Sequence, residues 1–145
     1  MEKSRIVEDS QQNELMQFLG IRIDQAGGDE VVLSMEVTPR VHQYVGIMNG
    51  GISLLLCETA ASLGAVLASD LERCTPVGIE INANHLRAVS KGVIKATAKP
   101  VYHGRTTSIW NTEITNERGK LICVSRCTIL LRRSPASPPP AQPDA

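Results

Sequence analysis

Hydrophobic and polar residues divide the chain into one long apolar segment and several short alternating ones. The segment from Gly46 to Ser69 is apolar on every helical face after its Gly50-Gly51 pair, which predicts a helix inside the protein. Between Arg40 and Asp70 the one formally charged side chain is Glu58, in the middle of this helix. An ionised carboxylate there is costly unless it is paired or faces a site. Glu58 is therefore the leading candidate for a functional residue.

The alternating segments predict strands on both sides of this helix in the chain. A short amphipathic helix is expected near Leu15–Leu19, ending at Gly20. Strands that are apolar on one side need an apolar cover, and the long helix supplies it. The expected fold class is α+β, an antiparallel sheet wrapped around one central helix. The expected strands are 21–24, 30–37, 77–86, 93–101, 106–116 and 121–131.

The length of 145 residues indicates a single domain. We expect a loose N-terminal segment over residues 1–14, the folded domain over 15–133, and a disordered proline-rich tail over 134–145. An antiparallel sheet of this kind leaves an exposed edge and apolar surface that a second copy can cover. The chain is therefore expected to form at least a homodimer.

The composition gives no indication of several classes of partner. Fifteen basic and fifteen acidic residues balance, which gives no reason to expect nucleic acid or an anionic membrane as partner. The polar N-terminus lacks the apolar region of a signal peptide, and the long helix carries Glu58 at its centre, so a cytoplasmic protein is expected. The four cysteines form no Cys-x-x-Cys pair and are expected to be reduced and buried. The three histidines suit no metal motif, so no metal is expected.

The ordered set Gln43, Asn49-Gly50-Gly51 and Glu58 resembles the hotdog-fold acyl-CoA thioesterases, which include 4-hydroxybenzoyl-CoA thioesterase and the PaaI-like proteins. That group carries Gln, then His-Gly-Gly, then a helical Glu eight residues after the first Gly. The segment GIEINANHLRAVSKG, residues 78–92, resembles more closely still the bacterial enzymes that act on 1,4-dihydroxy-2-naphthoyl-CoA in menaquinone synthesis. The resemblance covers residues 15–131. It implies a hotdog hydrolase for an aromatic acyl-CoA, arranged as a dimer or a dimer of dimers.

The resemblance also implies roles for the residues of the motif. Glu58 acts as nucleophile on the thioester carbonyl or as general base for water. The N–H of Gly50, at the helix start, stabilises the oxyanion, and Gln43 holds the carbonyl or the water. Helix spacing, and not the resemblance, adds Ser62, which lies one turn beyond Glu58 on the same face and is expected to orient its carboxylate. Asn49 stands where the group has histidine; it can exchange hydrogen bonds but cannot carry a proton near neutral pH.

Coenzyme A is expected as part of the substrate, with no separate cofactor. Arg87 and Arg105 can meet its phosphates, with Arg132 and Arg133 as further candidates. The resemblance places the substrate against Gly78, His85, Leu86, Arg87, Ala88, Tyr102, His103, Gly104, Arg105, Thr106 and Thr107. It further implies a site shared by two subunits, with Gln43 and Gly50 of one chain facing Glu58 of the other.

Several alternatives stay open at this point. The substrate could be a phenylacetyl-CoA or medium-chain acyl-CoA, or the chain could be a catalytically weak acyl-CoA-binding protein. Glu58 could be a structural carboxylate, the Gly50-Gly51 pair a plain helix start, and Arg87 and Arg105 solvated strand charges.

Overall fold

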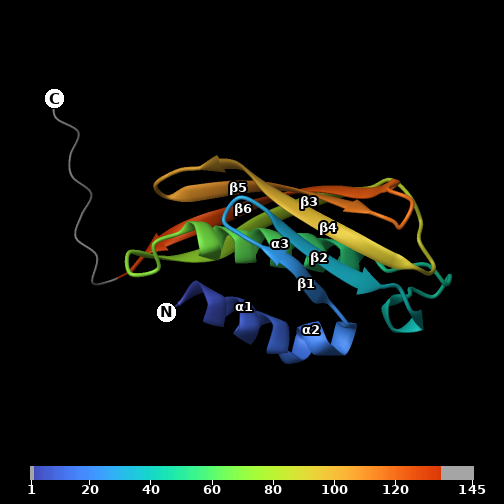
Figure 1. Cartoon of the computed structure of the whole chain (residues 1–145). Coiled ribbons are helices and arrows are strands. Elements are labelled where there is room, and N and C mark those ends of the chain that lie inside the picture. The colour runs from blue at the N-terminus through green and yellow to red at the C-terminus, as the bar shows by residue number, and fades with distance from the viewer. Residues whose placement is uncertain (1, 135–145) are drawn as a thin grey trace.

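Six antiparallel strands form one curved sheet, and helix α3 (Gly50–Ala68) lies in its concave side (Figure 1). The computed structural model describes residues 2–134, and the strand order is β1-β2-β4-β5-β6-β3. This arrangement confirms the predicted hotdog fold. The strands are β1 (Arg22–Ala26), β2 (Val31–Glu36), β3 (Cys74–His85), β4 (Val93–His103), β5 (Thr107–Thr115) and β6 (Leu121–Arg133).

One face of α3 packs tightly against the sheet. Leu56, Cys57 and Ala60 on this face are fully buried. Trp110 of β5 is also fully buried, and its ring lies so close to Gly64 that any side chain at position 64 would overlap it. The Trp110 Nε1–H donates a hydrogen bond to Ser108 Oγ at 2.8 Å. The contact between the Trp110 ring and Gly64 sets the distance of α3 from the sheet, and with it the position of the residues on the opposite face of the helix.

The opposite face of α3 is only half-buried, so the predicted enclosure of the whole helix is wrong for a single chain. Glu58, Thr59 and Ser62 all lie on this partly open side. By length and composition alone α3 could cross a membrane, but half of it is buried as the core helix of this fold. The apolar residues of α3 therefore have two environments: one face of the helix packs on the sheet, and the opposite face is left partly open in a single chain.

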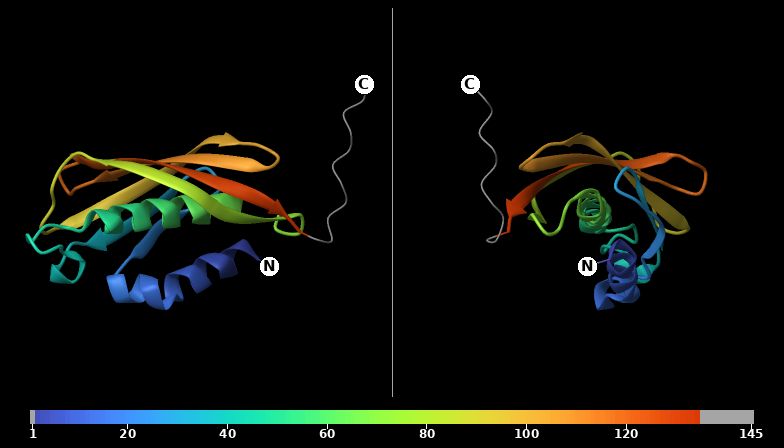
Figure 2. Two further views of the ribbon diagram at one scale, coloured as in Figure 1. Left: turned by 180° about the vertical axis from the view of Figure 1, so that it is seen from behind. Right: turned by 60° about the vertical axis from the view of Figure 1, so that its left-hand side comes forward.

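Two N-terminal helices, α1 (Lys3–Gln12) and α2 (Glu14–Leu19), lie on the side of α3 away from the sheet (Figure 2). The prediction of a loose segment over residues 1–14 is therefore wrong for α1. Ile6 is buried in the core. The Gln11 side chain ties α1 to the sheet, since its amide donates to Ile21 O at 2.9 Å and accepts from Ile23 N–H at 2.7 Å. The predicted tail, apart from Ser134, lies outside the described residues.

The cysteines are all free, as predicted, but they differ in burial. Cys57, Cys123 and Cys127 are buried, whereas Cys74 at the start of β3 is half-exposed. Burial raises the pKa of Cys127 to about 12, and the negative charge of Glu58 adds to the effect. A hydrogen bond with Cys123 and burial likewise raise the pKa of Cys57. Cys57 and Cys127 are therefore neutral packing residues at physiological pH.

Candidate active site

The start of α3 presents an unpaired backbone donor. Gly50 is the first helical residue, and Asn49 caps the helix because its Oδ1 accepts the Gly51 N–H at 2.8 Å. Among residues 2–134 the Gly50 N–H has no hydrogen-bond partner. A free N–H at the positive end of a helix dipole suits an oxyanion. The start of α3 thus carries a free backbone donor at Gly50.

A tight loop holds Gln43 close to this helix start. Gln43 N–H donates to Ile47 O at 2.8 Å, and Gly46 N–H donates back to Gln43 O at 3.0 Å. Gly46 has φ of 79°, a backbone conformation that favours glycine. The exposed tip of the loop carries Tyr44 and Val45, which are 98% and 55% exposed. Gln43 and Gly50 share one cavity of about 320 Å³ with the segment His85–Ala88.

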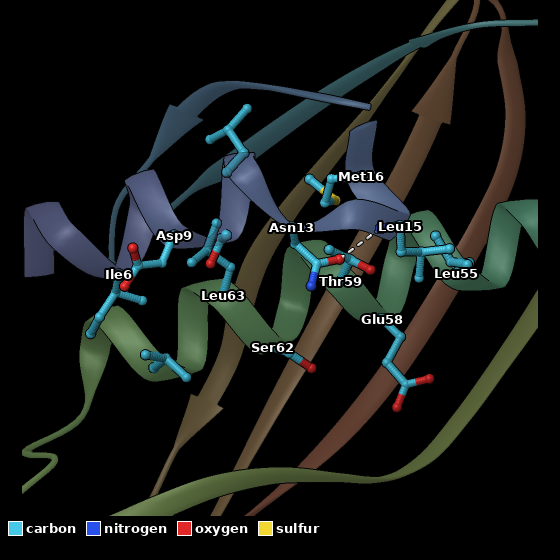
Figure 3. Close-up of a pocket in the computed structure, with 13 residues that line it drawn as sticks. Ile6, Asp9, Asn13, Leu15, Met16, Leu55, Glu58, Thr59, Ser62 and Leu63 are labelled. Carbon is cyan, nitrogen blue, oxygen red and sulfur yellow. Dashed lines mark hydrogen bonds between the residues drawn. The ribbon is translucent and has the colours of Figure 1, made fainter. Parts of the chain in front are cut away.

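Glu58 lies farther along α3 and lines a second cavity, of about 700 Å³, together with Ser62. Figure 3 shows both side chains projecting from α3 on the side away from α1 and α2. The Glu58 carboxylate lies against Gly78 of β3: a Cβ at position 78 would overlap Oε1 and stand 3.5 Å from Cδ. Within residues 2–134 no hydrogen bond or ion pair engages the carboxylate, and Ser62 lines the same cavity without bonding to it. Glu58 is therefore a half-buried acceptor free to meet a substrate or water.

Glu58 and Gly50 of one chain do not meet. Eight residues of α-helix separate them, a rise of about 12 Å along the axis. A single thioester carbonyl cannot contact both groups across that distance. Gln43, Gly50 and Glu58 are close in sequence, but in a single chain Gln43 and Gly50 line one cavity and Glu58 lines the other.

The predicted coenzyme A residues are divided in the same way. Gly78 pairs with Ile129, which pairs with Ser108 and through it with His103, so Gly78 and the segment 102–107 share one row of the sheet. His85 lies seven residues further along β3, roughly 20 Å away at strand geometry. Gly78 and the segment 102–107 lie on the side of Glu58, and the segment His85–Ala88 lies beside Gly50. Tyr102, His103, Arg105 and Thr106 are exposed, Gly104 and Thr107 half-buried, and Leu86, Arg87 and Ala88 exposed.

Residues 45–123 match the thioesterase superfamily. The chain belongs to the thioesterase superfamily. A 1,4-dihydroxy-2-naphthoyl-CoA hydrolase from Listeria monocytogenes is 40% identical over 119 residues, covering 82% of this chain and 96% of its own. An enzyme of the same name from Escherichia coli is 38% identical over 111 residues, covering 77% and 81%. The crystal structure of a mutant of thioesterase PA1618 from Pseudomonas aeruginosa matches with a TM-score of 0.84 at 33% identity, covering 90% and 94%. The chain is accordingly a thioester hydrolase.

The larger cavity of this thioesterase contains residues that the sequence did not single out. Asp9 and Asn13 come from the α1–α2 segment and Thr59 from α3, and they stand among apolar side chains. Asn13 Oδ1 is engaged by Leu15 N–H at 3.0 Å, which leaves its amide donors free. No sequence signal marked this set, because it depends on how α1 and α2 fold back over α3. The apolar lining comes from Ile6, Leu15, Met16, Ile23, Leu55, Leu63 and Val66.

The capping contact of Asn49 gives a stability prediction. Asn49→Ala removes the acceptor for Gly51 N–H and should lower the free energy of unfolding by about 1 kcal/mol. Asn49→Ser is the matched control, because serine also caps and should stay close to the parent. Urea unfolding of the three proteins measures the difference. An alanine variant with an unchanged midpoint would show that the cap contributes nothing.

Proposed function

We propose that this thioesterase hydrolyses an aromatic acyl-CoA of the 1,4-dihydroxy-2-naphthoyl type to the free acid and coenzyme A. The observation that carries the proposal is the Glu58 carboxylate, free of protein partners and seated in the space left by Gly78 at the edge of a large cavity. Two relatives near 40% identity bear the name of that hydrolase. The proposal places this activity in menaquinone biosynthesis.

Glu58 is the group that starts the reaction. As nucleophile its carboxylate attacks the thioester carbonyl carbon, giving an anhydride that water then opens; as general base it takes a proton from an attacking water. In both routes negative charge develops on the carbonyl oxygen, and the free N–H of Gly50 stabilises it. Gln43 holds the carbonyl or the water, and Ser62 positions the carboxylate.

The two halves of the site come from two copies of the chain. Glu58 needs an oxyanion donor that its own Gly50, about 12 Å along the helix, cannot supply. The open face of α3 and the outer edge of β3, which has no strand partner among residues 2–134, are surfaces that a second copy covers. Two-fold symmetry then gives two equal sites per homodimer. Pairing of dimers would give the homotetramer.

The acyl group occupies the cavity lined by α1, α2 and α3, with Glu58 at its edge. Its volume of about 700 Å³ lies within the range of roughly 300–1,000 Å³ usual for small-molecule sites. The apolar lining suits an aromatic ring, and Asp9, Asn13 and Thr59 offer partners for ring hydroxyls. A plain medium-chain acyl group has no hydroxyl groups to form hydrogen bonds with these side chains.

The coenzyme A portion is held by the exposed segments on the two sides of the shared site. Arg87 and Arg105 are exposed and suited to its phosphates. No cofactor takes part in this reaction. All four cysteines are free thiols, which accords with a cytoplasmic enzyme.

Release of free thiol from a panel of acyl-CoAs tests this function. We expect the highest kcat/KM with hydroxylated aromatic acyl-CoAs, and lower values with phenylacetyl-CoA and medium-chain acyl-CoAs. A reversed order would favour the aliphatic or phenylacetyl alternative. Tight binding of acyl-CoA without thiol release would show a binding protein instead of an enzyme.

A further inference from the structure

We propose that His85 is a catalytic residue whose Nε2–H donates a hydrogen bond to the thioester carbonyl oxygen, beside the N–H of Gly50. This inference rests on the proposed thioesterase function and adds a second oxyanion donor to it.

The His85 ring lies directly against the start of α3. Its Nε2 is 2.9 Å from the position that a Cβ of Gly50 would take, and its Cε1 is 3.2 Å away. Glycine at position 50 therefore leaves the space that the imidazole occupies. His85 and Gly50 line one cavity with Gln43 at this helix start.

The backbone of His85 is well fixed while its side chain is free. His85 pairs with Cys123 of β6, and the N–H groups of Leu86 and Arg87 both donate to Ile122 O, at 2.7 and 3.2 Å. Among the described residues the imidazole has no hydrogen-bond partner. A preorganised backbone with an unengaged donor is the arrangement that oxyanion stabilisation requires.

The other polar groups around this cavity are less suited to that role. Asn49 uses its Oδ1 to cap α3. His85 and Arg87 are both exposed, but Arg87 has a long flexible side chain that suits a phosphate. Of the residues that line the cavity, Arg87 is the one Asp, Glu, Lys or Arg.

The chemical role is charge stabilisation without proton transfer. When the thioester carbon is attacked, its oxygen gains an electron pair and accepts hydrogen bonds from His85 Nε2–H and Gly50 N–H. Collapse of the tetrahedral intermediate re-forms the carbonyl and breaks the C–S bond. The sulfur leaves with the electron pair of the C–S bond as the coenzyme A thiolate, and His85 keeps its proton throughout.

Three variants separate this role from simple binding of coenzyme A. His85→Ala should lower kcat by about 10²–10³-fold, the usual loss for one oxyanion donor, with KM little changed. His85→Gln should keep kcat within about tenfold of the parent, because its amide N–H reaches the position of the imidazole Nε2. Arg87→Gln serves as the comparison and should raise KM while leaving kcat nearly intact.

Steady-state kinetics with the best substrate of the acyl-CoA panel supply the readout, with melting temperatures as the folding check. If His85→Ala does not fold, His85→Asn takes its place, since its shorter amide stops before the Nε2 position. An unchanged kcat with raised KM, or equal loss in the Ala and Gln variants, would overturn the donor role. A parent protein that releases no thiol from any acyl-CoA would instead reject the proposed function, and with it this inference.

Discussion

Replacing Glu58 with Gln lowers kcat for acyl-CoA hydrolysis by about 10³-fold or more, while the fold is retained. The substitution keeps the shape of the side chain and removes the negative charge that attacks the carbonyl or activates water. Folding should survive because Glu58 is half-buried and makes no hydrogen bond or ion pair within residues 2–134. Thiol release and a thermal melt measure the two effects separately.

Glu113→Gln is the matched control, since Glu113 lies exposed on β5, away from both cavities. It should leave kcat and the melting temperature unchanged. Glu58→Asp adds detail: it should keep part of the activity if the carboxylate works through water, and less if it must reach the carbonyl carbon. Near-normal turnover by Glu58→Gln would remove Glu58 from the mechanism.

Gly78→Ala should lower kcat by about 10²-fold, a loss typical of a misplaced catalytic group. The new methyl group would occupy the place of the Glu58 carboxylate oxygen. Because that oxygen ends a flexible side chain, the carboxylate should move and the backbone should not. The expected result is therefore a large kinetic effect with little loss of stability.

A double-mutant comparison shows whether the Gly78 effect acts through Glu58. Gly78→Ala introduced into the Glu58→Gln protein should cause almost no further loss, because the group it displaces is already inactive. Losses that multiply in the double variant would mean that Gly78 contributes independently, for example through the substrate itself.

Much of the fold was predictable because its hydrophobic periods are clear. The strands after α3 alternate regularly, and the helix begins at the glycine pair, so both were placed within a few residues of their bounds. The N-terminal helix α1 was not predicted, because its segment is mostly polar and Ile6 and Val7 are its only apolar residues. Its order depends on tertiary contacts such as those of Gln11 with β1.

The site was predictable as a set of residues but not as a geometry. The motif identified Gln43, Gly50 and Glu58, and the structure puts the first two in one cavity and the third in another. The contact of His85 with Gly50 depends on how β3 and the loop before α3 come together, and sequence spacing carries no information on it. The cap made by Asn49 is local, since it joins residues two apart in the chain.

The account rests centrally on a site shared between two copies, and subunit mixing tests it most directly. Gln43→Ala disables one half of a shared site and Glu58→Ala the other, so each homodimer should be inactive. In a heterodimer of the two, one site collects both lesions and the other collects neither. Heterodimers purified through two different tags, with subunit exchange confirmed by mass spectrometry, should therefore recover up to about half of the parent activity. If each site lay within a single chain, every site would keep one lesion, and heterodimers as inactive as their parents would contradict the account.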